Sequence, residues 1–166
     1  MKKRRVLKKG KIIYTRKGEF VLKLADKLMK EIKPFCQRVK IAGSIRRHEK
    51  NPIDIDIVCI PKDKKKLENF LLLKGEKIQG GLHEATFKIK GVKVELYYTV
   101  PEEWGAELLA YSSEKGAEIG LRIIAKKKGF KLSQHGLFKG NSRVAGKTEK
   151  EIYSRLGRKW KTAERR

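Results

Sequence analysis

Two carboxylates, Asp54 and Asp56, stand one residue apart in the strongly apolar stretch 53–60. Side chains in a β-strand alternate between faces, so both carboxylates point to one side and Ile53, Ile55 and Ile57 to the other. Two like charges about 7 Å apart on one face repel each other unless a divalent cation lies between them. Oxygen ligands of this kind suit Mg²⁺, which completes its octahedron with water and phosphate oxygens. The alternative is an exposed edge strand whose aspartates are merely solvated.

A Gly-Ser pair and two arginines precede these aspartates. Gly43 and Ser44 follow a strand predicted over 39–42, where a turn would offer backbone N–H groups and a hydroxyl to an anion. Arg46 and Arg47 add guanidinium groups suited to phosphate. Each feature alone is common in turns and on solvated surfaces. Together they predict a phosphate-binding turn beside a metal site, the arrangement that nucleotidyl transfer requires.

A third carboxylate on a neighbouring strand would complete a two-metal site. In the strand predicted over 92–100, Lys93, Glu95 and Tyr97 share one face, and Glu95 is the acid among them. We therefore expect Glu95 to be the third ligand. Alternatively, Glu95 is an exposed residue paired with Lys93 on a hairpin.

The chain is strongly basic. Forty-three Lys and Arg residues against nineteen Asp and Glu give a formal net charge of +24, which attracts polyanions, most often nucleic acid. No apolar stretch is long enough for a membrane span, and no secretory signal, basic amphipathic helix or lipidation signal is evident. We therefore expect contact with DNA but not with a membrane. We also expect an intracellular location, cytoplasmic or nucleoid-associated, or a virion for a viral source.

Apolar periodicity predicts a mixed α+β fold in two parts. A small mixed sheet with flanking helices is expected over 1–101, and a smaller, mostly helical part over 102–166, because the composition shifts at Pro101. Cys36 and Cys59 lack metal-ligand spacing and are expected to be small buried thiols. The expected helices are 19–32, 62–73, 102–110, 114–128 and 148–156, the expected strands are 11–14, 39–42, 53–60, 85–90 and 92–100, and a short segment covers 130–138.

These motifs together resemble the family X DNA polymerases, the group that includes polymerase beta. The pattern Gly43-Ser44-x-Arg46-Arg47 followed by Asp54-x-Asp56 resembles the nucleotidyltransferase signature of that family. The segment "LLAYSSEKGAEIGLRIIAKKKGFKLSQHGLF" resembles its thumb, and "TEKEIYSRLGRKW" resembles its C-terminal close. The resemblance runs from about residue 18 to the C-terminus. It implies a nucleotidyltransferase palm over 1–101 and a nucleotide-selecting thumb over 102–166.

The resemblance also implies residue roles. Asp54 and Asp56 would bind two Mg²⁺ ions, with Mn²⁺ as a substitute, and Glu95 would bind the catalytic ion and help to deprotonate the primer 3′-OH. The implied contacts of the incoming dNTP are Gly43, Ser44, Arg46 and Arg47 at its phosphates, Tyr111, Ser112 and Ser113 at its sugar, and Glu118 at its base. The expected DNA contacts are Lys93, Arg122, Lys126, Lys127, Lys128, Gln134, His135, Arg143 and Lys147, with the basic tail 155–166 and the N-terminal Lys/Arg cluster. Tyr111 could equally be a packing residue, and His135 is expected to be a structural or DNA-contacting residue rather than a catalyst.

The sequence departs from the family pattern in three respects. Glu95 stands where the family usually has Asp, and one extra methylene moves a carboxylate by about 1 Å, which can change a rate about a hundredfold. Ile53 precedes Asp54 where many members have Gly. The chain also resembles the short members that consist of palm and thumb alone, so we expect no lyase domain and a monomer.

The sequence therefore predicts a metal-dependent DNA-directed DNA polymerase. It would add dNMPs to a primer 3′-OH on a gapped or primer-template duplex, filling short gaps in DNA repair. One alternative is a template-independent or RNA-directed nucleotidyltransferase on the same palm. A second alternative is a non-catalytic DNA-binding protein whose site has decayed at Glu95.

Overall fold

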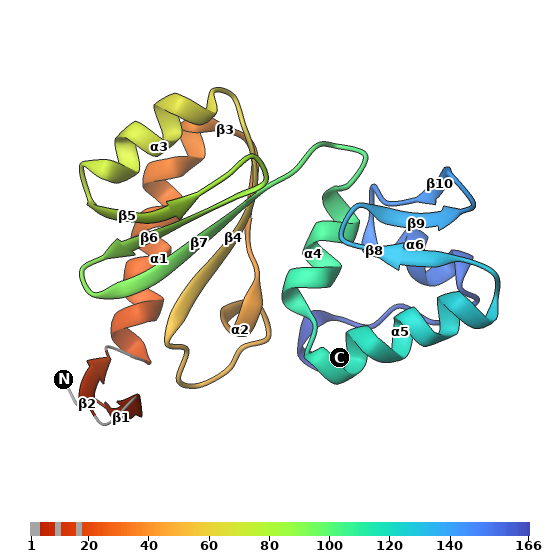
Figure 1. Cartoon of the computed structure of the whole chain (residues 1–166), viewed down its shortest axis with the longest axis horizontal. Helices are drawn as coiled ribbons and strands as arrows, with labels where there is room; N and C mark the ends of the chain where they lie inside the picture. Colours follow the sequence, from red (N-terminus) through yellow and green to blue (C-terminus); the bar gives the residue numbers. More distant parts are fainter. Residues whose placement is uncertain (1–3, 9–10, 16–17) are drawn as a thin grey trace. The chain divides into compact units, whose positions relative to one another are not determined.

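The computed structural model describes residues 4–8, 11–15 and 18–166, with side chains described from Gly18 onward. The chain divides into two compact units, Met1–Tyr98 (unit 1) and Thr99–Arg166 (unit 2) (Figure 1). The division lies three residues before the expected boundary at 101. Among the described residues, no helix combines the length and the apolar character that a membrane span needs.

Unit 1 is built on a five-stranded mixed sheet with the strand order β3-β4-β7-β6-β5. β4 lies parallel to β7, and the other neighbouring pairs are antiparallel. The sequence pattern does not predict β5, because its residues are nearly all exposed and show little alternation. The strands are β3 (Cys36–Ile41), β4 (Asp54–Pro61), β5 (Gly75–Gly80), β6 (Glu84–Ile89) and β7 (Val92–Tyr98).

One face of this sheet is covered by α1 (Glu19–Ile32) and α3 (Lys64–Leu72), as Figure 1 shows. The bounds of α1 are those expected from its apolar spacing, which turns one stripe of the helix toward the sheet. The buried residues of this core include Val21, Leu24, Leu28, Ile55, Ile57, Leu67, Leu71, Phe87, Val94 and Leu96. Cys36 and Cys59 are buried free thiols, as expected.

The end of β7 is attached to α3 and β5 through Glu68. The Tyr98 hydroxyl donates to Glu68 Oε1 at 2.7 Å, and Lys77 Nζ lies 2.7 Å from Glu68 Oε2. Burial alone would raise the pKa of the Glu68 carboxyl, but the hydrogen bonds from Lys77 and Tyr98 outweigh it and hold that pKa below its ordinary value. This carboxylate therefore joins one helix and two strands of unit 1.

Near the N-terminus the strand expected over 11–14 is present as β2 (Lys11–Thr15), which pairs antiparallel with β1 (Arg4–Lys8). Lys2 and Lys3, part of the basic cluster expected to contact DNA, lie outside the described residues.

Unit 2 contains three α-helices and a three-stranded antiparallel sheet with the order β10-β9-β8. The sequence pattern does not predict this sheet, because strands of three or four residues are too short to show a period. Residues Ala106, Leu121, Leu137 and Ile152 are among those that join helices and strands in one core. The elements are α4 (Trp104–Ser112), α5 (Lys115–Lys127), β8 (Lys131–Ser133), β9 (Gly136–Lys139), β10 (Ser142–Ala145) and α6 (Glu149–Arg155).

In unit 2, α4 packs closely against Thr148, the residue before α6. A Cβ on Gly105 would lie 2.2 Å from the backbone carbonyl carbon of Thr148. We therefore expect Gly105→Ala to lower the free energy of unfolding of unit 2 by about 1–3 kcal/mol. Both tryptophans, Trp104 and Trp160, lie in unit 2, so urea unfolding followed by tryptophan fluorescence reports on this unit.

Gly120→Ala is the matched control, because Gly120 lies inside α5 with nothing within 4 Å of an added Cβ. This substitution should raise stability by about 0.5–1 kcal/mol. Equal effects of the two substitutions would contradict the close approach of α4 to Thr148.

Candidate active site

The register between β4 and β7 brings the three expected carboxylates to one region of the sheet. Asp56 pairs with Glu95, and Asp54 pairs with Lys93. Ile55 and Ile57 belong to the core beneath α1 and α3, so the two aspartates lie on the opposite face of the sheet. The structure therefore places Glu95 directly beside Asp56 on the neighbouring strand.

Burial and neighbouring carboxylates disfavour the ionised forms of Asp54 and Asp56. Burial and then the charge of Glu95 raise the pKa of Asp54. Burial raises the pKa of Asp56 to about 6, and the charges of Asp54 and Glu95 add to the shift. A carboxylate whose ionised form is disfavoured in this way is one that a cation would stabilise.

Tyr97 contacts this site, although the sequence motifs assign it no role. Its hydroxyl donates to Asp56 Oδ1 at 3.3 Å and partly offsets the upward shift of the Asp56 pKa. The alternation that selects Glu95 also places Tyr97 on the same face, so this was the signal available in the sequence. Alternation along β7 does not predict the hydrogen bond to Asp56, because that bond depends on which strand lies beside β7.

Glu95 is engaged by a neighbour on its own strand. Lys93 Nζ lies 2.7 Å from Glu95 Oε2, and the Lys93 side chain is 54% exposed. This is the pairing that the sequence offered as the alternative role of Glu95, and it coexists with the position beside Asp56. The carboxylate oxygens of Asp54, Asp56 and Glu95 do not all lie within 4.8 Å of one another. Among residues 18–166, a different group of acidic and histidine side chains meets that distance.

The expected Gly-Ser turn is the start of a short helix, α2 (Gly43–Arg46). Gly43 has a φ of 59°, and a Cβ there would lie 1.9 Å from Asp56 Oδ2, so a glycine is required at this contact. The Ala42 N–H donates to the Asp56 backbone carbonyl at 2.8 Å, which attaches the start of α2 to β4. The Ser44 hydroxyl is buried without a hydrogen-bond partner among the described residues. A buried hydroxyl of this kind suits an anion with acceptor oxygens.

The two arginines of the motif lie at the end of α2. Arg46 is its last residue, and Arg47 follows as the C-cap. The Arg47 Nε donates to Glu49 Oε1 at 3.0 Å, and the Arg47 side chain is 18% exposed. Arg47 is thus oriented by a carboxylate, which a phosphate group could replace.

The residues expected near the sugar and the base belong to unit 2. Tyr111 and Ser112 end α4, and Ser113 follows as its C-cap with its hydroxyl donating to the Leu109 carbonyl at 2.7 Å. Ser112 is fully buried. Glu118 and Arg122 lie one turn apart on α5 and form an ion pair at 2.5 Å. The residues expected at the base and at the template strand are therefore bound to each other.

The other expected DNA contacts in unit 2 differ in how accessible they are. Lys126, Lys127 and Lys128 are exposed at the end of α5, and Lys147 is exposed before α6. Gln134 and His135 form the turn between β8 and β9.

Two of the expected basic contacts are engaged by carboxylates. Arg143 binds Glu103 and lies over the Phe138 ring. Arg166, part of the expected basic tail, has a side chain that is 0% exposed and pairs with Glu149 at 2.8 Å. The expectation that the whole tail faces DNA is therefore wrong for Arg166, because its charge is used inside unit 2.

Comparison with known proteins identifies the family of the chain. The family model of the DNA polymerase beta thumb matches residues 107–166. Repair DNA polymerase X of African swine fever virus is 32% identical over 138 residues, which cover 76% of this chain and 79% of the viral protein. The protein of the same name from a Kenyan pig isolate is 30% identical over 147 residues, covering 81% and 84%. DNA polymerase IV of Saccharomyces cerevisiae is 38% identical over 65 residues, covering 39% of this chain and 11% of the yeast protein.

The chain belongs to the family X DNA polymerases. By class it is a DNA-directed DNA polymerase of mixed α+β fold, as the sequence motifs predict.

The raised pKa of Asp56 gives a pH-dependent stability. In chelator-treated protein the folded state holds the Asp56 proton up to about pH 6, whereas the unfolded state releases it near the ordinary pKa of 3.8. The folded state is therefore the better proton binder in this window, and stability is lost as pH rises from about 4 to about 6. We expect Asp56→Asn, which cannot ionise, to be more stable than the wild type by about 2–3 kcal/mol at pH 7 and similar at pH 4.

Native-state amide exchange of β4 and β7 measures this difference within unit 1, with variant and wild type compared at the same pH. Asp26→Asn is the control, because Asp26 is exposed on α1 and outside the site. A gain for Asp56→Asn of the same size at pH 4 and pH 7 would contradict the electrostatic explanation.

Proposed function

We propose that the protein is a metal-dependent DNA polymerase that adds deoxynucleoside monophosphates to a primer 3′-OH and fills short gaps in DNA repair. The observation that carries the proposal is the pairing of Asp56 with Glu95 in parallel strands, on the face that also bears Asp54. The name of the viral relatives, repair DNA polymerase X, supports the repair role.

The three carboxylates would hold two Mg²⁺ ions. Their oxygens are the ligand type that Mg²⁺ prefers, and burial together with neighbouring negative charge raises the pKa values of Asp54 and Asp56. Bound Mg²⁺ would acidify the primer hydroxyl and neutralise charge on the phosphates. Tyr97 would hold Asp56 in its orientation through its hydroxyl, and Glu95 would exchange Lys93 for the metal.

The nucleotide phosphates would bind at the start of α2. The buried Ser44 hydroxyl can donate to a phosphate oxygen, and Gly43 lets the backbone lie against Asp56 without a side chain between them. Arg47 would transfer its guanidinium from Glu49 to the triphosphate, with Arg46 beside it. Phosphate and metal ligands thus come from adjacent segments of unit 1.

The DNA would be bound chiefly through its phosphates. With a formal charge of +24, the protein would gain affinity by releasing counterions from the DNA phosphates. Contacts of this kind do not depend on the base sequence. The exposed lysines Lys126, Lys127, Lys128 and Lys147 are the strongest candidates, because no carboxylate contact engages their side chains in the structure described for residues 18–166. Lys93, Arg122, His135 and Arg143 remain proposed contacts that would first release the carboxylates that bind them, Glu95, Glu118 and Glu103. Gln134 also remains a proposed contact.

Primer extension tests the catalytic proposal directly. We expect Mg²⁺-dependent incorporation of the complementary nucleotide on a one-nucleotide gap, at a lower rate on an open primer-template. Asp54→Asn should slow incorporation by more than about a hundredfold, because it removes a metal ligand and keeps the side-chain shape. Asp26→Asn, outside the site, should extend the primer as the wild type does.

The substrates also separate the alternative functions. Equal incorporation of all four nucleotides, or extension of a lone single strand, would show a template-independent enzyme, and preference for an RNA template would show an RNA-directed one. Absence of extension with both Mg²⁺ and Mn²⁺ would indicate a DNA-binding protein without catalysis.

The ion pair of Lys93 with Glu95 yields a separate prediction about metal affinity. Removal of a positive charge beside a cation site should tighten the binding of the cation, so Lys93→Met should lower the Mg²⁺ concentration that gives the half-maximal extension rate. Glu95→Gln should raise this concentration, because an amide is a weaker ligand than a carboxylate. Lys65→Met, an exposed substitution on α3, is the matched control for charge. A half-maximal concentration that is unchanged in Lys93→Met would contradict the role of Lys93.

A further inference from the structure

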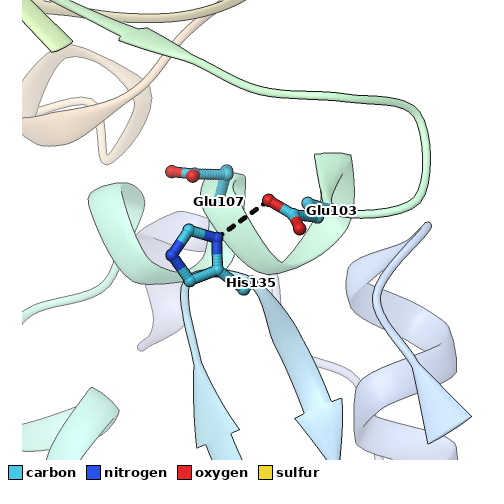
Figure 2. Close-up of side chains that lie close together, drawn as sticks. All are labelled: Glu103, Glu107 and His135. Atoms are coloured by element: carbon cyan, nitrogen blue, oxygen red, sulfur yellow. Dashed lines mark hydrogen bonds and ion pairs between the residues drawn. The ribbon is translucent and has the colours of Figure 1, made fainter. Parts of the chain in front are cut away.

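A second cluster of metal-ligating side chains lies in unit 2, among residues to which the proposed polymerase chemistry gives no metal role. Glu103 is the N-cap of α4, Glu107 lies in the first turn of the same helix, and His135 lies in the turn between β8 and β9. One ligand atom from each of the three residues lies within 4.8 Å of the other two. Figure 2 shows the side chains of Glu103 and Glu107 above the His135 ring, with a dashed line that joins the ring to Glu103.

Glu107 is the unusual member of this cluster. Glu107 is 3% exposed, and its Oε2 has no hydrogen-bond partner among the described residues. An unpaired carboxylate in such a position is costly unless a proton or a cation neutralises it. Burial and the nearby charge of Glu103 raise the pKa of Glu107 to about 8, in agreement with that cost.

Glu103 and His135 are held in place by each other and by Arg143. A ring nitrogen of His135, Nδ1, lies 2.8 Å from Glu103 Oε2. Arg143 binds the other oxygen of Glu103 and donates from Nε to the His135 carbonyl at 2.9 Å. One guanidinium thus orients both the carboxylate and the turn that carries the imidazole, as outer contacts of metal ligands do. When Glu107 is ionised and the imidazole is neutral, two carboxylates and one guanidinium leave a net negative charge that a cation would neutralise.

We propose that Glu103, Glu107 and His135 bind Zn²⁺ or a similar transition-metal dication. One imidazole nitrogen and two carboxylate oxygens form a ligand set that suits Zn²⁺, whereas Mg²⁺ prefers oxygen ligands alone. Tetrahedral coordination places ligand atoms about 3.3 Å apart, so the 2.8 Å contact between His135 and Glu103 would open slightly as the three side chains turn toward the ion. A fourth position would remain for water.

The bound ion would connect the start of α4 to the β8–β9 turn. These two segments are distant in sequence, so the ion would close a long loop within unit 2 and stabilise that unit against unfolding. The site uses none of the proposed palm ligands Asp54, Asp56 and Glu95. Its test is therefore independent of whether the polymerase proposal holds.

Metal titration of the whole chain tests this proposal. Zn²⁺ binding is measured by calorimetry and Co²⁺ binding by its visible absorption, both in excess Mg²⁺ so that oxygen-ligand sites are filled. We expect one equivalent of each metal to bind, a Co²⁺ spectrum typical of low coordination number, and a higher unfolding temperature in the tryptophan fluorescence of unit 2. Glu107→Gln and His135→Gln should each weaken binding more than tenfold.

Two controls separate this site from others. Asp54→Asn should bind Zn²⁺ as the wild type does, and so should Glu114→Gln, which changes an exposed glutamate at the N-cap of α5. Glu107→Gln removes a buried charge and should fold, so its result is decisive even if His135→Gln is unstable. Absence of saturable Zn²⁺ and Co²⁺ binding, or binding that is unchanged in Glu107→Gln, would overturn the proposal.

Discussion

The parallel pairing of β4 with β7 is the constraint on which unit 1 depends. Parallel neighbours cannot be joined by a hairpin, so the chain between them passes through α3, β5 and β6 before it returns as β7. The returning strand brings Glu95 beside Asp56, and the same alternation places Val94 and Leu96 in the core. A slip of one residue would exchange these two sets of side chains. Burial of the apolar face therefore fixes the position of the acidic one.

The acidic face is maintained against its own electrostatics. Burial is the main cost of ionising Asp54 and Asp56, and the charges of neighbouring carboxylates add to it. Within unit 1, Lys93 and the Tyr97 hydroxyl offset only part of this cost. The hydrophobic packing of α1 and α3 on the opposite face offsets the free-energy cost of these buried carboxylates. The proposed catalytic carboxylates and the apolar core of unit 1 thus lie on opposite faces of one sheet.

The sequence predicts those features that depend on local periodicity. Alternation was sufficient to place Asp54, Asp56 and Glu95 on one face, and the apolar spacing of residues 19–32 predicts α1 at its observed bounds. Contacts between elements are a different matter. The hydrogen bond from Tyr97 to Asp56 depends on the strand order, and the meeting of His135 with Glu103 depends on a three-stranded sheet whose strands are too short to show a pattern. The pairing of Lys93 with Glu95 was open to sequence reasoning only as one of two alternatives, because it depends on side-chain torsions.

The attachment of Tyr98 to Glu68 has a consequence for how Glu95 can adapt. β7 is hydrogen-bonded to β4 on one side and to β6 on the other, and its last residue is held by α3. Fraying of this strand would break two ladders together, so its backbone is among the least deformable parts of unit 1. Glu95 has one more rotatable bond than an aspartate would have at the same position. The position of its carboxylate is therefore set by the side-chain torsions of Glu95, because the backbone of β7 moves little. The extra methylene lets the carboxylate change position without any movement of the strand.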